Sequence, residues 1–115
     1  MTQDQRDAVI VGWAHGRFGK LDAEDIEALF ASVGTEALEH AGVHAGDVDL
    51  VTVGVLNAGF SKQGFHAGLV SVAVPGLEHT PALRVENACA TGTTALYTAI
   101  DAIEAGRVRI ALVIG

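Results

Sequence analysis

The stretch Val85-Glu-Asn-Ala-Cys-Ala-Thr-Gly-Thr-Thr-Ala-Leu96 decides the fold, because a strand-like pattern changes to a helical one inside it. The residues around Leu83 and Val85 predict a short strand. Residues 90–105 predict a helix, since apolar residues recur at helical spacing at Leu96, Ala99, Ile100 and Ile103. The only cysteine of the chain, Cys89, therefore lies at or just before the first helical turn.

This position of Cys89 suits a nucleophile. The N–H groups of a first helical turn have no partner within the helix, and the positive end of the helix dipole favours an anion. The thiolate is the nucleophilic form of cysteine. Small neighbours would let a substrate carbonyl approach the backbone, namely Ala88, Ala90, Thr91 and Gly92. A small buried hydrophobic residue without chemistry is the alternative, and spacing alone leaves both open.

The rest of the chain alternates between strand-like and helical segments. Further strands are predicted at 8–13, 50–55 and 109–114, and further helices at about 26–38 and 64–74. This alternation predicts the α/β class, with a mostly parallel sheet of about four strands and helices packed on it. We expect the helix after Cys89 to be the most buried, because it has few charges before Asp101.

Turn residues mark the ends of the first two predicted helices. Acidic residues precede the first helix, at Asp22, Glu24 and Asp25, where they suit the cap and first turn. Gly42 follows that helix at a position where a positive φ is often required. Pro75-Gly76 ends the second helix.

Composition describes a globular piece with an acidic surface. Half of the residues are hydrophobic and 18% are charged, a high apolar fraction for so small a unit. We therefore expect some apolar faces to lie against further polypeptide or another subunit. The net charge of −7 argues against nucleic acids and anionic membranes as partners. A single cysteine fits a reducing compartment, and with neither a leader at residues 1–6 nor a long apolar run we expect a cytoplasmic protein without a membrane span.

The five histidines do not have the spacing of a metal site. His40 and His44 are four residues apart, but Gly42 between them ends the helix that would align them. Two such ligands fall short of a usual zinc set, so we expect no metal. The histidines are His15, His40, His44, His66 and His79.

Two loops have compositions that occur in ligand sites. Gly12, Gly16 and Gly19 fail the spacing of the dinucleotide fingerprint, and we interpret their loop as a structural turn. The polar loop after the strand at 50–55 lies where α/β proteins often place ligand contacts. Its residues include Asn57, Ala58, Gly59, Ser61 and Lys62. The sequence assigns no cofactor-binding residue.

The segment Glu86–Leu96 resembles the nucleophilic-cysteine segment of thiolases, especially the sterol-carrier-protein-type and acetyl-CoA acetyltransferase-like branch. Three further stretches are similar to the thiolase N-terminal domain in order and spacing: 8–13 with 18–20, 41–43 with 48–50, and 110–115. Ketoacyl synthases and hydroxymethylglutaryl-CoA synthases also have a cysteine at the start of this helix.

The resemblance implies an acyl-CoA acyltransferase. Cys89 would take an acyl group from a 3-ketoacyl-CoA and pass it to coenzyme A or, in reverse, to an acetyl-CoA carbanion. Coenzyme A thioesters are then substrates, and no covalently bound cofactor is implied. Two alternatives stay open: a ketosynthase-type condensing enzyme, and a non-catalytic fragment or subunit that needs a partner chain.

Length limits what this resemblance covers. Thiolases are much longer, and their histidine motif, second catalytic cysteine and asparagine-bearing segment lie in later parts. We therefore expect residues 1–115 to be a truncated thiolase N-terminal domain, or one piece of a split enzyme, that is inactive alone.

The resemblance also implies association. In thiolases the strand before the nucleophile, here 83–87, pairs with its copy in a second subunit. A homodimer or tetramer, or a partner subunit that supplies the missing half, is therefore expected. The loop at 57–62 lies near that interface in the family, so an interface role and a ligand role both stay open.

Overall fold

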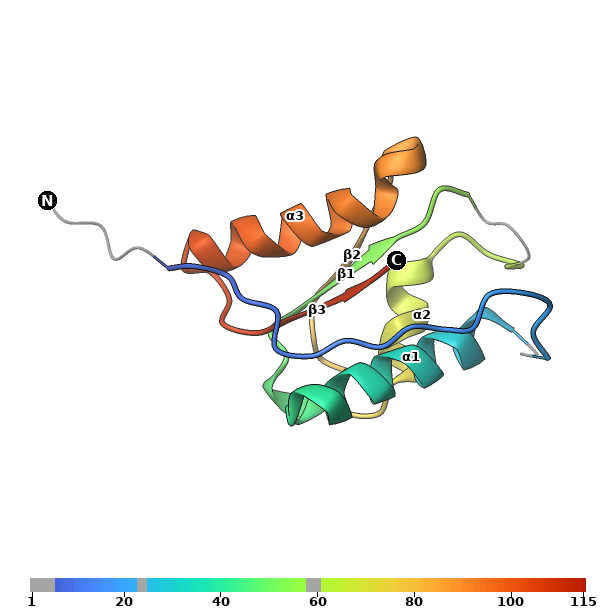
Figure 1. Cartoon of the computed structure of the whole chain (residues 1–115), viewed down its shortest axis with the longest axis horizontal. Coiled ribbons are helices and arrows are strands. Elements are labelled where there is room, and N and C mark those ends of the chain that lie inside the picture. The colour runs from blue at the N-terminus through green and yellow to red at the C-terminus, as the bar shows by residue number, and fades with distance from the viewer. Residues whose placement is uncertain (1–5, 23–24, 58–60) are drawn as a thin grey trace, which may run out of the picture.

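The computed structural model describes residues 6–22, 25–57 and 61–115. Helices and strands alternate along the described chain, with two short 3₁₀ turns between them (Figure 1). The elements are α1 (Ile26–Ala41), η1 (Ala45–Asp47), β1 (Leu50–Gly54), α2 (His66–Ala73), β2 (Ala82–Val85), η2 (Ala88–Ala90), α3 (Thr91–Glu104) and β3 (Ala111–Ile114). The predicted α/β class is confirmed.

The three described strands form one parallel sheet in the order β2-β1-β3. Val51 in the central strand pairs with Ala82 on one side and with Leu112 on the other. α3 covers one face of this sheet, and α1 and α2 cover the opposite face (Figure 1). The carboxyl ends of all three strands therefore meet at one edge of the sheet, and η2 and α3 begin at that edge.

The predicted strand at residues 8–13 is wrong: this segment runs past α1 as irregular chain (Figure 1). β3 pairs with β1 on one side, and no described strand lies along its other side. A strand needs a hydrogen-bonded neighbour, so an apolar run without one stays irregular. A hydrogen bond connects this segment to α1: the backbone N–H of Trp13 donates to the side-chain Nδ1 of His40 at 3.0 Å. The sheet accordingly has three described strands instead of about four.

The predicted ends of α1 are confirmed. Asp25 is the N-cap, and its carboxylate accepts a hydrogen bond from the Ala28 N–H at 2.8 Å. Gly42 ends the helix with φ 67°, a left-handed conformation that glycine adopts without steric cost.

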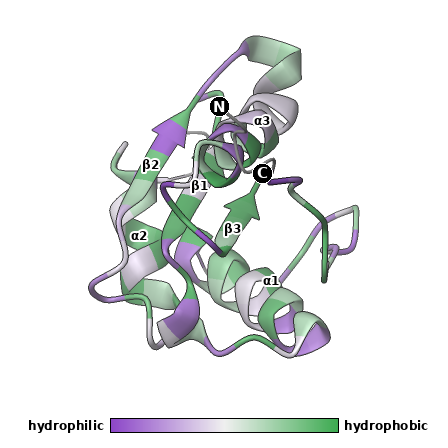
Figure 2. Ribbon diagram, turned by 90° about the vertical axis from the view of Figure 1, so that its left-hand side faces the viewer, coloured by the Kyte–Doolittle hydropathy of each residue, from purple (hydrophilic) through white to green (hydrophobic). Residues whose placement is uncertain are grey.

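The core lies between the sheet and the layer of α1 and α2. Val51 and Val53 of β1 are fully buried there, together with Val70, Val74 and Leu77. β3 is coloured as hydrophobic along its length in Figure 2 and β1 over much of its length, whereas the head of β2 is hydrophilic. This layer supplies most of the burial that holds the sheet in place.

The expectation that the helix after Cys89 is the most buried is wrong. α3 buries Thr91, Ala95 and Ala99, whereas Tyr97 is 61% exposed. One face of α3 packs on the sheet, and none of the described elements covers its other face. The shorter α2 buries more of its length, at His66, Ala67, Leu69 and Val70.

Among the described residues, no helix is both long and apolar enough to cross a membrane.

Candidate active site

Cys89 lies in η2, four residues after the carboxyl end of β2 and two residues before the start of α3. Its thiol is free and exposed. The predicted position, just before the first helical turn, is confirmed. In parallel α/β sheets this edge is where ligands bind, so the fold presents the thiol at a suitable place.

The residue before Cys89 has a strained backbone. Ala88 has φ 45°, in the left-handed region that residues with a Cβ rarely adopt, at a cost of about 1–2 kcal/mol. Two hydrogen bonds brace this turn: the Ala88 N–H donates to Glu86 Oε1 at 2.8 Å, and the Ala90 N–H donates to the Asn87 carbonyl at 2.8 Å. The turn is therefore a tight elbow between strand and helix.

The Thr91 hydroxyl closes the elbow. Its oxygen accepts a hydrogen bond from the Asn87 N–H at 3.0 Å, and the hydroxyl donates to the Ala88 carbonyl at 2.6 Å. Thr91 is 8% exposed, so water competes little for these bonds. A second side-chain link follows one turn later, where Asn87 Nδ2 donates to Thr94 Oγ1 at 3.2 Å.

Two glycines bring the first turn of α3 onto the strand ends. A Cβ on Gly54, the last residue of β1, would lie 3.0 Å from the Thr91 carbonyl oxygen and 3.1 Å from Thr91 Cγ2. A Cβ on Gly115, directly after β3, would lie 3.2 Å from Gly92 Cα. Sequence reasoning missed these positioning glycines; the available signal is a glycine at the carboxyl end of each of two apolar strands, as the last residue of β1 and the first residue after β3.

Arg84 of β2 organises the loop between β1 and α2. Its Nε and Nη2 donate to the Val55 carbonyl at 3.2 and 3.1 Å, and its Nη1 donates to the Gly64 carbonyl at 3.2 Å. The guanidinium therefore joins the two ends of this loop. Because β1 and β2 are neighbours in the sheet, the loop after β1 begins beside the elbow after β2. Sequence reasoning did not single out this arginine.

The polar loop itself is described only in part. Asn57 is exposed, and the Ser61 hydroxyl donates to the Gln63 carbonyl at 2.8 Å. Ala58 and Gly59 lie outside the described residues. The ligand and interface roles expected for this loop stay predictions.

The family model for "Thiolase, N-terminal domain" matches residues 8–115. The chain belongs to the thiolase family. It is 34% identical over 110 residues to an acetyl-CoA acetyltransferase of Methanocaldococcus jannaschii, covering 96% of this chain and 28% of that protein. It is also 33% identical over 94 residues to a β-ketoacyl-[acyl-carrier-protein] synthase III of Streptomyces lividans, covering 79% of this chain and 26% of that protein.

Solved structures agree on the fold of this thiolase chain. The acetyl-CoA acetyltransferase of Syntrophomonas wolfei superimposes with a TM-score of 0.77 at 24% identity, over 96% of this chain and 28% of that one. The chain thus spans little more than a quarter of the length of the relatives that it matches.

The histidines of this thiolase domain have separate local surroundings. His40 accepts the Trp13 N–H, and the His15 ring packs against Phe18 with centroids 5.0 Å apart. His66 is fully buried, with Nδ1 3.1 Å from the Gly64 carbonyl oxygen. In the described part of the chain, no three histidine, cysteine or acidic side chains come close enough together to hold a metal ion.

Gly12, the first of the three glycines that fail the dinucleotide spacing, packs closely against the end of α1. A Cβ on Gly12 would lie 2.6 Å from Ala41 Cβ at the end of α1. This close approach supports the interpretation of the loop as structural.

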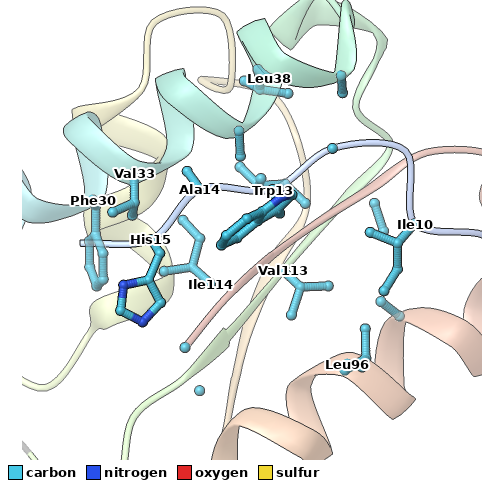
Figure 3. A pocket seen from close by; sticks show the side chains of 18 of the residues that line it. Ile10, Trp13, Ala14, His15, Phe30, Val33, Leu38, Leu96, Val113 and Ile114 are labelled. Carbon is cyan, nitrogen blue, oxygen red and sulfur yellow. The ribbon is translucent and has the colours of Figure 1, made fainter. Parts of the chain in front are cut away.

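An apolar groove of about 800 Å³ runs between the N-terminal segment, α1, α3 and β3 (Figure 3). Ile10 and Trp13 lie on one side, and Leu96 and Val113 lie across from them. Cys89 does not line this groove. The groove is an apolar surface beside the open edge of β3, as expected of a domain whose relatives contain much more polypeptide.

Proposed function

We propose that this chain is the nucleophile-bearing part of a thiolase-type acyl-CoA acyltransferase, with Cys89 as the nucleophile. The exposed thiol at the strand-to-helix elbow, in a chain that belongs to the thiolase family, carries the proposal. The name of the M. jannaschii relative supports a coenzyme A thioester as the substrate class.

In the thiolytic direction, the Cys89 thiolate attacks the 3-keto carbon of a 3-ketoacyl-CoA. The bond between C2 and C3 breaks, and its electron pair leaves on the acetyl-CoA carbanion, which takes a proton. The thiol of a second coenzyme A then attacks the acyl-cysteine and regenerates Cys89. The reverse sequence is a Claisen condensation of two acyl-CoA molecules.

The backbone contributes to this chemistry at Cys89 itself. No acceptor for the Cys89 N–H occurs among the described residues, so this N–H is available to a developing oxyanion. The elbow is open beside Gly92, because a Cβ added to this glycine would meet nothing within 4 Å. The base and the second acid then come from polypeptide beyond these 115 residues, and the isolated chain turns over no ketoacyl-CoA.

A ketosynthase-type condensing enzyme is the second candidate, because the S. lividans relative is a ketoacyl synthase. Both classes of enzyme form an acyl-cysteine. They differ in the molecule that carries the second substrate, which is coenzyme A in the thiolase type and acyl carrier protein in the ketosynthase type. The match to the thiolase N-terminal domain over residues 8–115 favours the thiolase type. Condensation with acyl carrier protein but not with coenzyme A as the carrier would favour the ketosynthase.

The test uses the longer enzyme that contains this chain. Incubation with acetyl-CoA should place one acetyl group on Cys89, detected by peptide mass spectrometry. Cys89→Ala should abolish labelling and turnover and leave the circular dichroism spectrum unchanged, since an exposed thiol contributes little packing. Ala90→Ser, a matched change at the exposed neighbour, should retain labelling. Full turnover in Cys89→Ala would contradict the proposal.

Association through β2 is part of the proposal. β2 is an edge strand, with β1 on one side and its other edge unpaired in the described sheet, and Leu83 is 37% exposed. Pairing with a second copy would remove this open edge. We propose a homodimer, or a tetramer built from it, that works in the cytoplasm; a monomer by light scattering at micromolar concentration would contradict the assembly.

A further inference from the structure

We propose that Thr91 is a positioning residue that aims the Cys89 N–H and holds the thiol at the elbow. This inference rests on the proposed nucleophilic role of Cys89. It concerns a side chain that has no part in the bond-making steps above.

Thr91 holds the peptide unit between Ala88 and Cys89. The Thr91 hydroxyl donates to the Ala88 carbonyl at 2.6 Å, and the Thr91 N–H also points to this carbonyl. The Ala88 carbonyl and the Cys89 N–H belong to one planar trans peptide, so they point in opposite directions. A side chain that fixes the carbonyl therefore fixes the direction of the N–H that faces the oxyanion.

Thr91 also stabilises the strained backbone of Ala88. Ala88 is held at φ 45°, a conformation that persists only where its surroundings impose it. The Thr91 hydroxyl is bonded on both sides of Ala88, because its oxygen also accepts the Asn87 N–H at 3.0 Å. Without the hydroxyl, the Asn87 N–H loses its partner and the Ala88 carbonyl keeps only the Thr91 N–H, so the elbow can relax to an ordinary turn.

Thr91 is itself held in place by its surroundings. It is the buried residue of the elbow, at 8% exposure, and its carbonyl oxygen and Cγ2 lie 3.0 and 3.1 Å from the position that a Cβ on Gly54 would take. Contact with the central strand β1 therefore fixes the position of Thr91, and Thr91 in turn fixes the backbone at Cys89. A residue on a rigid base can hold a reacting group in one geometry.

Three single variants of the 115-residue chain test the inference. Thr91→Val removes the hydroxyl and keeps the shape, whereas Thr91→Ser keeps the hydroxyl. Thr98→Val is the matched control, because the Thr98 hydroxyl donates to the Thr94 carbonyl at 2.8 Å on the same helix, two turns from the elbow. The readouts are the alkylation rate of the sole cysteine with iodoacetamide at neutral pH and the hydrogen-exchange rate of the Asn87 amide.

We expect Thr91→Val to slow alkylation and to speed Asn87 exchange by about fivefold each, the factor that corresponds to one ordinary hydrogen bond. Thr91→Ser should stay close to the wild-type chain in both readouts, and Thr98→Val should change neither. If circular dichroism shows that Thr91→Val does not fold, Thr91→Ala removes the same hydroxyl with less steric demand and takes its place.

The outcomes separate this inference from the proposed function. A wild-type Cys89 that reacts no faster than free cysteine contradicts the nucleophile, and the inference with it. A fast wild-type Cys89 that stays fast in Thr91→Val overturns the positioning role alone. Equal slowing by Thr91→Val and Thr98→Val would also overturn it, because the effect would then be general destabilisation.

Discussion

Gly54 at the end of β1 lies directly against Thr91 at the start of α3, so close that a Cβ on Gly54 would be 3.0 Å from the Thr91 carbonyl oxygen. The contact joins the central strand to the helix that follows Cys89. It leaves no room for a side chain, because the neighbouring atom is backbone and cannot turn away as a flexible side chain would.

Gly54→Ala should therefore destabilise the chain by about 1–2 kcal/mol, the usual range for forcing an extra carbon into a packed site. Urea unfolding followed by circular dichroism measures the change. Gly46→Ala is the control, because a Cβ at Gly46 meets nothing within 4 Å, and we expect it to be neutral or slightly stabilising. Equal stability of the two variants would show that the first turn of α3 is not in contact with β1.

Arg84→Ala should loosen the loop between β1 and α2, since the guanidinium holds the carbonyls of Val55 and Gly64. Because these carbonyls are near solvent, water replaces part of the lost bonding and we expect a global loss of about 1 kcal/mol. Limited proteolysis should cut this loop faster than in the wild-type chain. Arg107→Ala, which removes an exposed guanidinium elsewhere, should leave the cleavage pattern unchanged; the same pattern in both variants would contradict the role of Arg84.

Asp49 should make stability depend on acid pH. The N–H groups of Arg109 and Ile110 donate to Asp49 Oδ2 at 2.8 and 3.1 Å and hold the pKa of this carboxyl below its ordinary value of 3.8. A carboxyl with a lowered folded-state pKa contributes stability above its unfolded pKa, and the contribution is lost as pH falls through the folded pKa.

Asp49→Asn should accordingly cost about 1 kcal/mol at pH 7, after allowance for screening of this exposed carboxylate by solvent. The gap between variant and wild type should close as the pH falls below 3.8. Denaturant unfolding at a series of pH values measures it, with Asp47→Asn on the nearby exposed turn as the control. A gap that stays constant with pH would mean that the charge of Asp49 does not contribute.

The fluorescence of Trp13 should show that the apolar groove is open to solvent. The chain's only tryptophan is 66% exposed, on the segment that lines the groove opposite β3. Acrylamide should quench its fluorescence almost as efficiently as that of free tryptophan. Strong protection from acrylamide would show that residues 8–13 pack against another surface, as they would in a completed sheet.

Features that depend on a few neighbouring residues were predictable from the sequence. The N-cap Asp25 and the terminating Gly42 depend on local backbone geometry, so α1 has the predicted ends. The position of Cys89 before a helix also follows from a local change in periodicity. The resemblance to thiolases was confirmed by the family match, whereas the role of Cys89 stays a proposal.

Features that depend on contacts between distant segments were decided only by the tertiary structure. Residues 8–13 have the composition of a strand, but a strand forms through hydrogen bonds to a neighbour, and none is described beside them. The strain at Ala88 and the contact between Gly54 and Thr91 leave no periodic pattern, because they arise where one helix is pressed onto the end of one strand. The sequence alone therefore determined the helices and strands from Ile26 onward and the place of the thiol, and packing between elements determined the geometry that holds it.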